Sequence, residues 1–250
     1  MASRFSTFTL AERLASHGFV VVGVGHTDNR LFDQLDGTAV DLSGEFLATR
    51  AADISAALDY VLEPPDTKLG DPLEGRLDPD AIGIFGHSFG AATTGLVLET
   101  DARFKAGAAL AAPLESPLLP GVTLANIEEP MLFFVATEDN SITEIGNNLI
   151  RNNFADLPAP AWKLELADAG HWSFTDICHI VDDFQPGCGE GQRQTNPDAT
   201  FTYLDIEVAR DITADALAAF FAYQLRGEAH ALEQLEAAHP SGAATLESHD

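Results

Sequence analysis

Positive charge is scarce in this sequence of 250 residues. It has 13 lysine and arginine residues, three of them lysine, against 39 aspartate and glutamate residues, and the formal net charge is −26. Proteins bind nucleic acids and anionic membrane surfaces through lysine and arginine, so this balance argues against both partners. Two interpretations of the acidic surface remain open, namely a surface that maintains solubility and an adaptation to high salt.

Long hydrophobic runs are missing as well. No apolar stretch approaches the roughly 20 residues that a helix needs to cross a bilayer, so we expect no membrane span. The first residues, MASRFSTFTLAERLASHG, have neither the basic start nor the apolar block of a signal peptide. By this criterion nothing in the sequence directs export.

Cysteine is nearly absent, and the two cysteines that occur lie close together. Cys178 and Cys188 are ten residues apart in a polar, glycine-containing segment. Free cysteines are usually buried in the core, whereas this segment is typical of a surface, so we expect a local disulfide. A disulfide implies an oxidising compartment, such as the periplasm or the exterior. This conflicts with the missing signal peptide and leaves the localisation open.

Signatures of metal and phosphate sites are also lacking. The two cysteines do not have the spacing of metal ligands, and no cluster of histidine and acidic residues suggests a metal. No glycine-rich phosphate loop is present. We therefore expect neither a metal nor a cofactor. Nothing in the sequence indicates an oligomeric state.

What the sequence does contain is the composition and pattern of one α/β domain. Hydrophobic residues make up 46% and charged residues 21% of the chain, as in globular proteins. Helix and strand patterns alternate, which predicts a mostly parallel sheet with helices on both faces. We expect a single domain over residues 1–237 and a disordered tail over 238–250. The expected strands are 19–24, 82–86, 106–113, 130–137 and 162–169, and the expected helices include 5–17, 143–153 and 214–226.

One short motif carries the chemistry. In the stretch AIGIFGHSFGAATTG, a buried strand runs into Gly86-His87-Ser88-Phe89-Gly90 and then into a helix of small residues. This Gly-x-Ser-x-Gly pattern, between a strand and a helix, is typical of a tight turn that lifts a serine oxygen above the sheet. The backbone N–H of the next residue, Phe89, would then point at a developing oxyanion. Ser88 is the predicted nucleophile.

A serine nucleophile needs a histidine to take its proton and a carboxylate to orient that histidine. In this fold the acid and the histidine follow the serine in that order, each just after a strand. The strand at 130–137 is followed by Asp139, and the strand at 162–169 is followed by His171. We therefore predict a triad of Ser88, Asp139 and His171.

Other residues compete for these roles. Glu138 is the second choice for the acid, because it still belongs to the strand end. His26 precedes the serine in the chain and is interpreted as a loop anchor, and His179 as a surface residue. Trp172 is a candidate for lining an acyl pocket, although packing is the commoner role of such a residue. Asp176 is interpreted as a structural hydrogen-bond partner.

Several segments carry a resemblance to a known family over roughly residues 5–225. They are LAERLASHGFVVVGVGHTDN, RAADISAALDYVLE, LDPDAIGIFGHSFGAAT, DARFKAGAALAAP and AGHWSFTDIC. With these segments the chain resembles the predicted dienelactone hydrolase branch of the α/β-hydrolases, close to platelet-activating factor acetylhydrolases and bacterial cutinase-like polyesterases. True dienelactone hydrolases have a cysteine nucleophile, so Ser88 argues against that substrate.

The resemblance implies a carboxylic ester hydrolase that acts on a small ester through an acyl-enzyme. Ser88, Asp139 and His171 match the triad positions, and Phe89 matches one oxyanion donor. Many relatives are exported, which agrees with the cysteine pair. Two alternatives remain open, namely a hydrolase of another acyl bond, such as an amidase or peptidase, and a catalytically silent binding protein.

The resemblance also predicts a gap in the sheet. In this fold, a strand and the loop carrying the second oxyanion N–H precede the first helix, here the one near Phe5. Residues 1–4 are too few for a strand, which typically needs about five residues. We therefore expect a sheet without its N-terminal strands and a gap between segments 19–24 and 82–86. We also expect that this sequence begins inside a longer chain.

Overall fold

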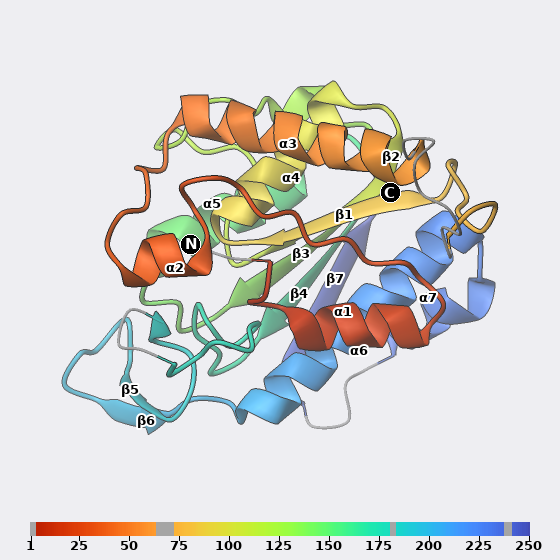
Figure 1. The fold of residues 1–250 in the computed structure, drawn as a ribbon. Helices are drawn as coiled ribbons and strands as arrows, with labels where there is room; N and C mark the ends of the chain where they lie inside the picture. Colours follow the sequence, from red (N-terminus) through yellow and green to blue (C-terminus); the bar gives the residue numbers. More distant parts are fainter. Residues whose placement is uncertain (1–3, 64–72, 181–183, 238–241) are drawn as a thin grey trace.

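A parallel sheet forms the centre of the molecule, with helices on both faces (Figure 1). The computed structural model describes residues 4–63, 73–180, 184–237 and 242–250. Within these residues the main sheet has five strands in the order β1-β2-β3-β4-β7. The first four are parallel, and β7 pairs antiparallel with β4 at one edge. The strands are β1 (Ile82–His87), β2 (Phe104–Leu110), β3 (Met131–Ala136), β4 (Ala161–Leu166) and β7 (Ala244–His249).

The central strands β2 and β3 are largely apolar because both of their faces are covered. Every residue of β3 is buried, as are all but one in β2. One face packs against α1 (Phe8–Ser16), α6 (Ile206–Arg226) and α7 (Ala229–Glu236). The other packs against α3 (Gly44–Leu62), α4 (Phe89–Thr100) and α5 (Thr143–Asp156). The predicted parallel sheet with two helical layers is thus confirmed.

Helix α6 begins earlier than the predicted 214–226. Asp205 caps its N-terminus by accepting hydrogen bonds from the backbone N–H groups of Glu207 and Val208, at 3.0 and 3.2 Å. Gly227, in the left-handed conformation at φ 66°, ends the helix, as expected of a glycine C-cap. Gly227 therefore predicts the C-terminal end of α6 correctly, whereas the sequence pattern does not identify Asp205 as the N-terminal cap.

The predicted disordered tail is wrong where the structure describes it. Residues 238–241 lie outside the described residues, but 244–249 form strand β7 on the free edge of β4. Glu247 forms an ion pair with Lys163 at 2.9 Å, and His249 Nε2 lies 2.6 Å from the carbonyl oxygen of Phe154. An edge strand needs only one partner, so a short and polar sequence suffices here.

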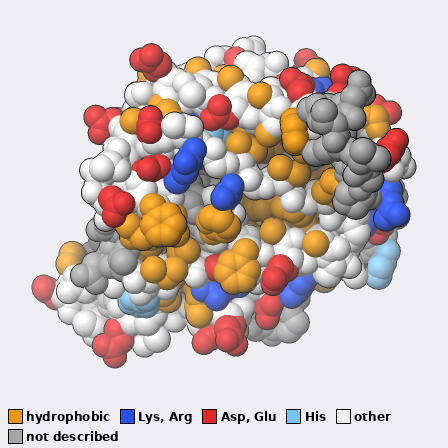
Figure 2. Space-filling model, in the orientation of Figure 1, with side chains coloured by type: hydrophobic (Ala, Val, Ile, Leu, Met, Phe, Trp, Pro, Cys, Tyr) orange, Lys and Arg blue, Asp and Glu red, His pale blue; other side chains and the backbone are white. Residues whose placement is uncertain are grey.

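The predicted strand at 19–24 is also wrong. In the described part of the chain, residues 20–25 make no backbone hydrogen bond to another segment, and β1 pairs on one side only, with β2. A groove of about 500 Å³ separates this segment from β1. Val20 and Val22 are about half exposed there, and Figure 2 shows hydrophobic side chains gathered in the hollow. A strand requires a hydrogen-bonded neighbour, and the expected gap in the sheet removes it.

The remaining described elements are short. The helix α2 (Leu31–Leu35) lies in the segment between residues 25 and 44. A small antiparallel hairpin of β5 (Glu190–Gln192) and β6 (Thr200–Thr202) lies in the segment between β4 and α6. A 3-10 helix spans Leu124–Asn126. None of the described helices is both long enough and apolar enough to cross a membrane.

Candidate active site

Ser88 lies in a strained turn between β1 and α4. Its backbone has φ 57° and ψ −123°, a conformation that non-glycine residues rarely adopt. A Cβ atom on Gly86 would lie 2.2 Å from the carbonyl oxygen of Gly90, so the turn closes only because residue 86 is glycine. Phe89 begins α4 directly after the serine, so its backbone N–H is one of the N-terminal donors for which a helix supplies no acceptor.

The structure brings the three predicted triad residues together. Asp139 follows β3, His171 follows β4, and both are buried. His171 Nδ1 lies 2.8 Å from Asp139 Oδ2, and His171 Nε2 lies 2.9 Å from Ser88 Oγ. With the Nδ1 proton donated to the carboxylate, Nε2 is left free to accept the serine proton.

The Asp139 carboxylate is fixed from its other side. Its Oδ1 accepts hydrogen bonds from the backbone N–H groups of Ser141 and Ile142, at 2.9 and 3.0 Å. Glu138, the alternative acid, points elsewhere. Its carboxylate oxygens accept hydrogen bonds from Arg193 Nη1 and from the backbone N–H of Gln194. Asp139, and not Glu138, is therefore the carboxylate that contacts the histidine.

His87 supports the histidine in a way that sequence reasoning missed. It is buried, and its Nε2 donates to the carbonyl oxygen of His171 at 2.7 Å. Burial lowers the pKa of His87 well below its usual value, and the nearby His171 lowers it further. His87 therefore remains neutral and adds no positive charge beside His171. A histidine inside the Gly-x-Ser-x-Gly motif was the only available sequence signal.

The remaining candidates lie outside the triad. Trp172 is buried and packs against His87 and Phe184, with ring centroids 5.2 and 4.9 Å apart, which favours the packing interpretation. His26 Nδ1 lies 2.8 Å from Asp53 Oδ2, so it joins its loop to α3.

Asp176 and His179, in the segment between β4 and α6, have structural contacts. Asp176 accepts a hydrogen bond from the backbone N–H of Thr9 and lies 3.7 Å from Arg210, which connects α1 to α6. His179 Nε2 lies 2.6 Å from the carbonyl oxygen of Cys188.

Across the described residues no group of three or more histidine, cysteine or acidic side chains is placed to hold a metal ion.

Cys178 and Cys188 form the expected disulfide. We predict that replacing both with serine lowers the free energy of unfolding by about 2–3 kcal/mol, because the bridge restricts a short loop in the unfolded chain. Chemical denaturation of the wild type and the double variant measures the difference. Titration of free thiols in the denatured, unreduced protein is the control, and two reactive thiols would contradict the disulfide.

The sequence matches a known protein family over most of its length. A family model described as PET hydrolase-like matches residues 1–177. The chain belongs to the PET hydrolase-like family. This agrees with the branch of α/β-hydrolases indicated by the sequence motifs.

The chain is also similar to individual named proteins, at moderate sequence identity. Platelet-activating factor acetylhydrolase of Bos taurus is 32% identical over 198 residues, covering 66% of this chain and 43% of that protein. Cutinase est1 of Thermobifida alba is 35% identical over 85 residues, covering 34% of this chain and 23% of that protein. The chain thus spans less than half the length of these curated relatives.

A solved structure gives the same answer for the fold. The ferulic acid esterase from Streptomyces cinnamoneus superposes with a TM-score of 0.60 at 26% identity, covering 86% of this chain and 58% of that chain. The expected α/β-hydrolase fold is confirmed.

Proposed function

We propose that this PET hydrolase-like chain hydrolyses carboxylic esters through a serine acyl-enzyme. The observation that carries the proposal is the continuous hydrogen-bonded series from Asp139 through His171 to Ser88. The names of the similar proteins, an acetylhydrolase, a cutinase and a ferulic acid esterase, support the ester as the bond that is cleaved.

In the first half of the reaction, Ser88 Oγ attacks the ester carbonyl carbon while His171 Nε2 accepts the hydroxyl proton. The carbonyl oxygen becomes an oxyanion, and the backbone N–H of Phe89, the residue after the nucleophile, is the proposed donor to it. The carbon–oxygen bond to the alcohol then breaks, and the alcohol leaves with the proton from Nε2. Asp139 stabilises the imidazolium that exists between these steps.

In the second half, water replaces the alcohol. His171 Nε2 takes a proton from the water, whose oxygen attacks the acyl carbon bound to Ser88. The bond to Ser88 Oγ breaks, the proton returns from Nε2 to the serine, and the carboxylic acid is released. Each bond that forms is balanced by one that breaks, and no cofactor enters.

We expect the protein to hydrolyse p-nitrophenyl acetate and butyrate with saturation kinetics. Release of p-nitrophenolate, followed by absorbance, measures the rate. The corresponding p-nitroanilides serve as the comparison, because an ester hydrolase should cleave them far more slowly. Faster cleavage of the anilides would indicate an amidase, and no turnover of either class would indicate a silent hydrolase fold.

A further inference from the structure

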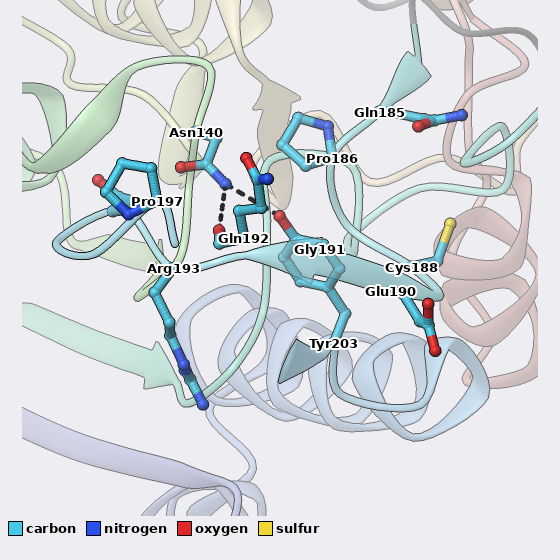
Figure 3. A pocket seen from close by; sticks show the side chains of 11 residues that line it. Asn140, Gln185, Pro186, Cys188, Glu190, Gly191, Gln192, Arg193, Pro197 and Tyr203 are labelled. Atoms are coloured by element: carbon cyan, nitrogen blue, oxygen red, sulfur yellow. Dashed lines mark hydrogen bonds between the residues drawn. The ribbon is translucent and has the colours of Figure 1, made fainter. Parts of the chain in front are cut away.

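A polar segment next to the triad connects the loop that carries Asp139 with the loop that carries His171. This segment, residues 189–204, contains β5 and β6 and lines a cavity of about 460 Å³ (Figure 3). Asn140 Nδ2 donates to the carbonyl oxygen of Gln192 and to the hydroxyl of Tyr203, both at 3.1 Å. The Tyr203 ring also packs against Gly170, where an added Cβ would lie 2.8 Å from Cε1. The segment therefore touches the residues adjacent to both Asp139 and His171.

Arg193 makes the most direct connection within this segment. Its Nη1 donates to Glu138 Oε1 at 2.9 Å and also to the carboxylate of Asp168. Glu138 immediately precedes Asp139, and Asp168 lies three residues before His171. The guanidinium lies over the ring of Phe201, 4.0 Å from its centroid, which restricts its position. One cation thus links the loop after β3 to the loop after β4.

The Arg193 guanidinium compensates the negative charges of Glu138 and Asp168. Glu138 and Asp168 each place a carboxylate oxygen within hydrogen-bond distance of the same nitrogen atom, so the two anions face each other closely. Without the guanidinium they would repel, and the two loops would be pushed apart. Three hydrogen bonds oppose the separation. Glu138 N–H donates to the Ala169 carbonyl at 2.9 Å, Thr137 N–H donates to the Leu166 carbonyl at 3.1 Å, and Asp168 N–H donates to Thr137 Oγ1 at 3.0 Å.

We propose that Arg193 is a positioning residue that holds the Asp139 loop against the His171 loop and so maintains the hydrogen bond between Asp139 and His171. The proposal rests on the proposed ester hydrolysis. No contact joins Arg193 to Ser88 or His171 among the described residues, so it acts through the loops and not on the reacting atoms.

Replacing Arg193 with glutamine should lower kcat by about 10-fold, with KM changed by less than about twofold, because displacing a catalytic group by a fraction of an ångström weakens the chemical step. Steady-state hydrolysis of p-nitrophenyl acetate measures both constants. Arg151→Gln is the matched control, since Arg151 also bridges two carboxylates, Glu144 at 2.7 Å and Glu165 at 2.9 Å. Its side chain is 27% exposed against 33% for Arg193, but its partners belong to α5 and β4, so kcat should be unchanged.

A second variant tests the cause. Adding Asp168→Asn to Arg193→Gln removes one of the two repelling charges and should restore kcat to within about threefold of the wild type. Salt should have a parallel effect, because about 1 M NaCl shortens the range of the repulsion to about 3 Å. We expect salt to raise kcat of Arg193→Gln relative to the wild type and to leave the double variant unaffected.

Three results would overturn the proposal. The first is a kcat of Arg193→Gln within twofold of the wild type. The second is an equal decrease of kcat in Arg151→Gln. The third is a change of Arg193→Gln that affects KM alone. A wild type that does not hydrolyse the ester would refute the proposed function instead. In that case the proton resonance of His171 Nδ1 tests the positioning directly, and an unchanged resonance in Arg193→Gln would refute it.

Discussion

Replacing Ser88 with alanine is expected to lower kcat for p-nitrophenyl ester hydrolysis by about 10⁴-fold or more. The hydroxyl oxygen is the atom that would form the acyl-enzyme, and no other described hydroxyl lies within hydrogen-bond distance of His171 Nε2. Labelling by a fluorophosphonate probe should disappear in the same variant, because the probe modifies an activated serine.

Ser16→Ala is a suitable control for this experiment. Ser16 lies on the exposed end of α1, where its hydroxyl donates to the carbonyl oxygen of Arg13 at 2.7 Å. This variant should retain both the rate and the labelling. If Ser88→Ala kept the wild-type rate, the assignment of the nucleophile would be wrong.

The second large effect separates Asp139 from its neighbour. Asp139→Asn should lower kcat by about 10⁴-fold, because an amide at this position favours the wrong tautomer of the histidine. Glu138→Gln should cost far less, about 10-fold or below, since Glu138 contacts Arg193 and Gln194 rather than His171. Both variants replace a carboxylate by the corresponding amide, and the two positions are adjacent, so each variant controls for the other.

The melting temperature must be measured beside the rate. Asp139 also accepts two backbone hydrogen bonds, and asparagine would lower stability if its amide group faced those N–H donors. The rates should therefore be compared at a temperature where both variants are fully folded. A larger loss in Glu138→Gln than in Asp139→Asn would move the predicted acid by one residue.

Parts of this protein follow from the sequence because they depend on local order. The strand, turn and helix around Ser88 are contiguous, and the glycine at 86 reports the close approach to the backbone of residue 90 that the turn requires. The positions of Asp139 and His171 follow because the ends of parallel strands meet at one edge of the sheet. The apolar runs of β2 and β3 are evident for a related reason, since both faces of these strands are covered.

Other parts depend on which distant segments meet, and the sequence does not contain that information in a local form. Residues 19–24 have the composition of a strand but pair with no strand in the described part of the chain, whereas the polar residues 244–249 form a strand because β4 has a free edge. The same holds within the site. Arg193 has no distinctive spacing from the triad, and His87, although it directly precedes Ser88, gives no local indication of its partner. Their contacts with His171, Glu138 and Asp168 arise only when loops far apart in the chain are brought together. Hydrogen bonds and ion pairs are short-range interactions, so only the tertiary structure decides which residues take part in them.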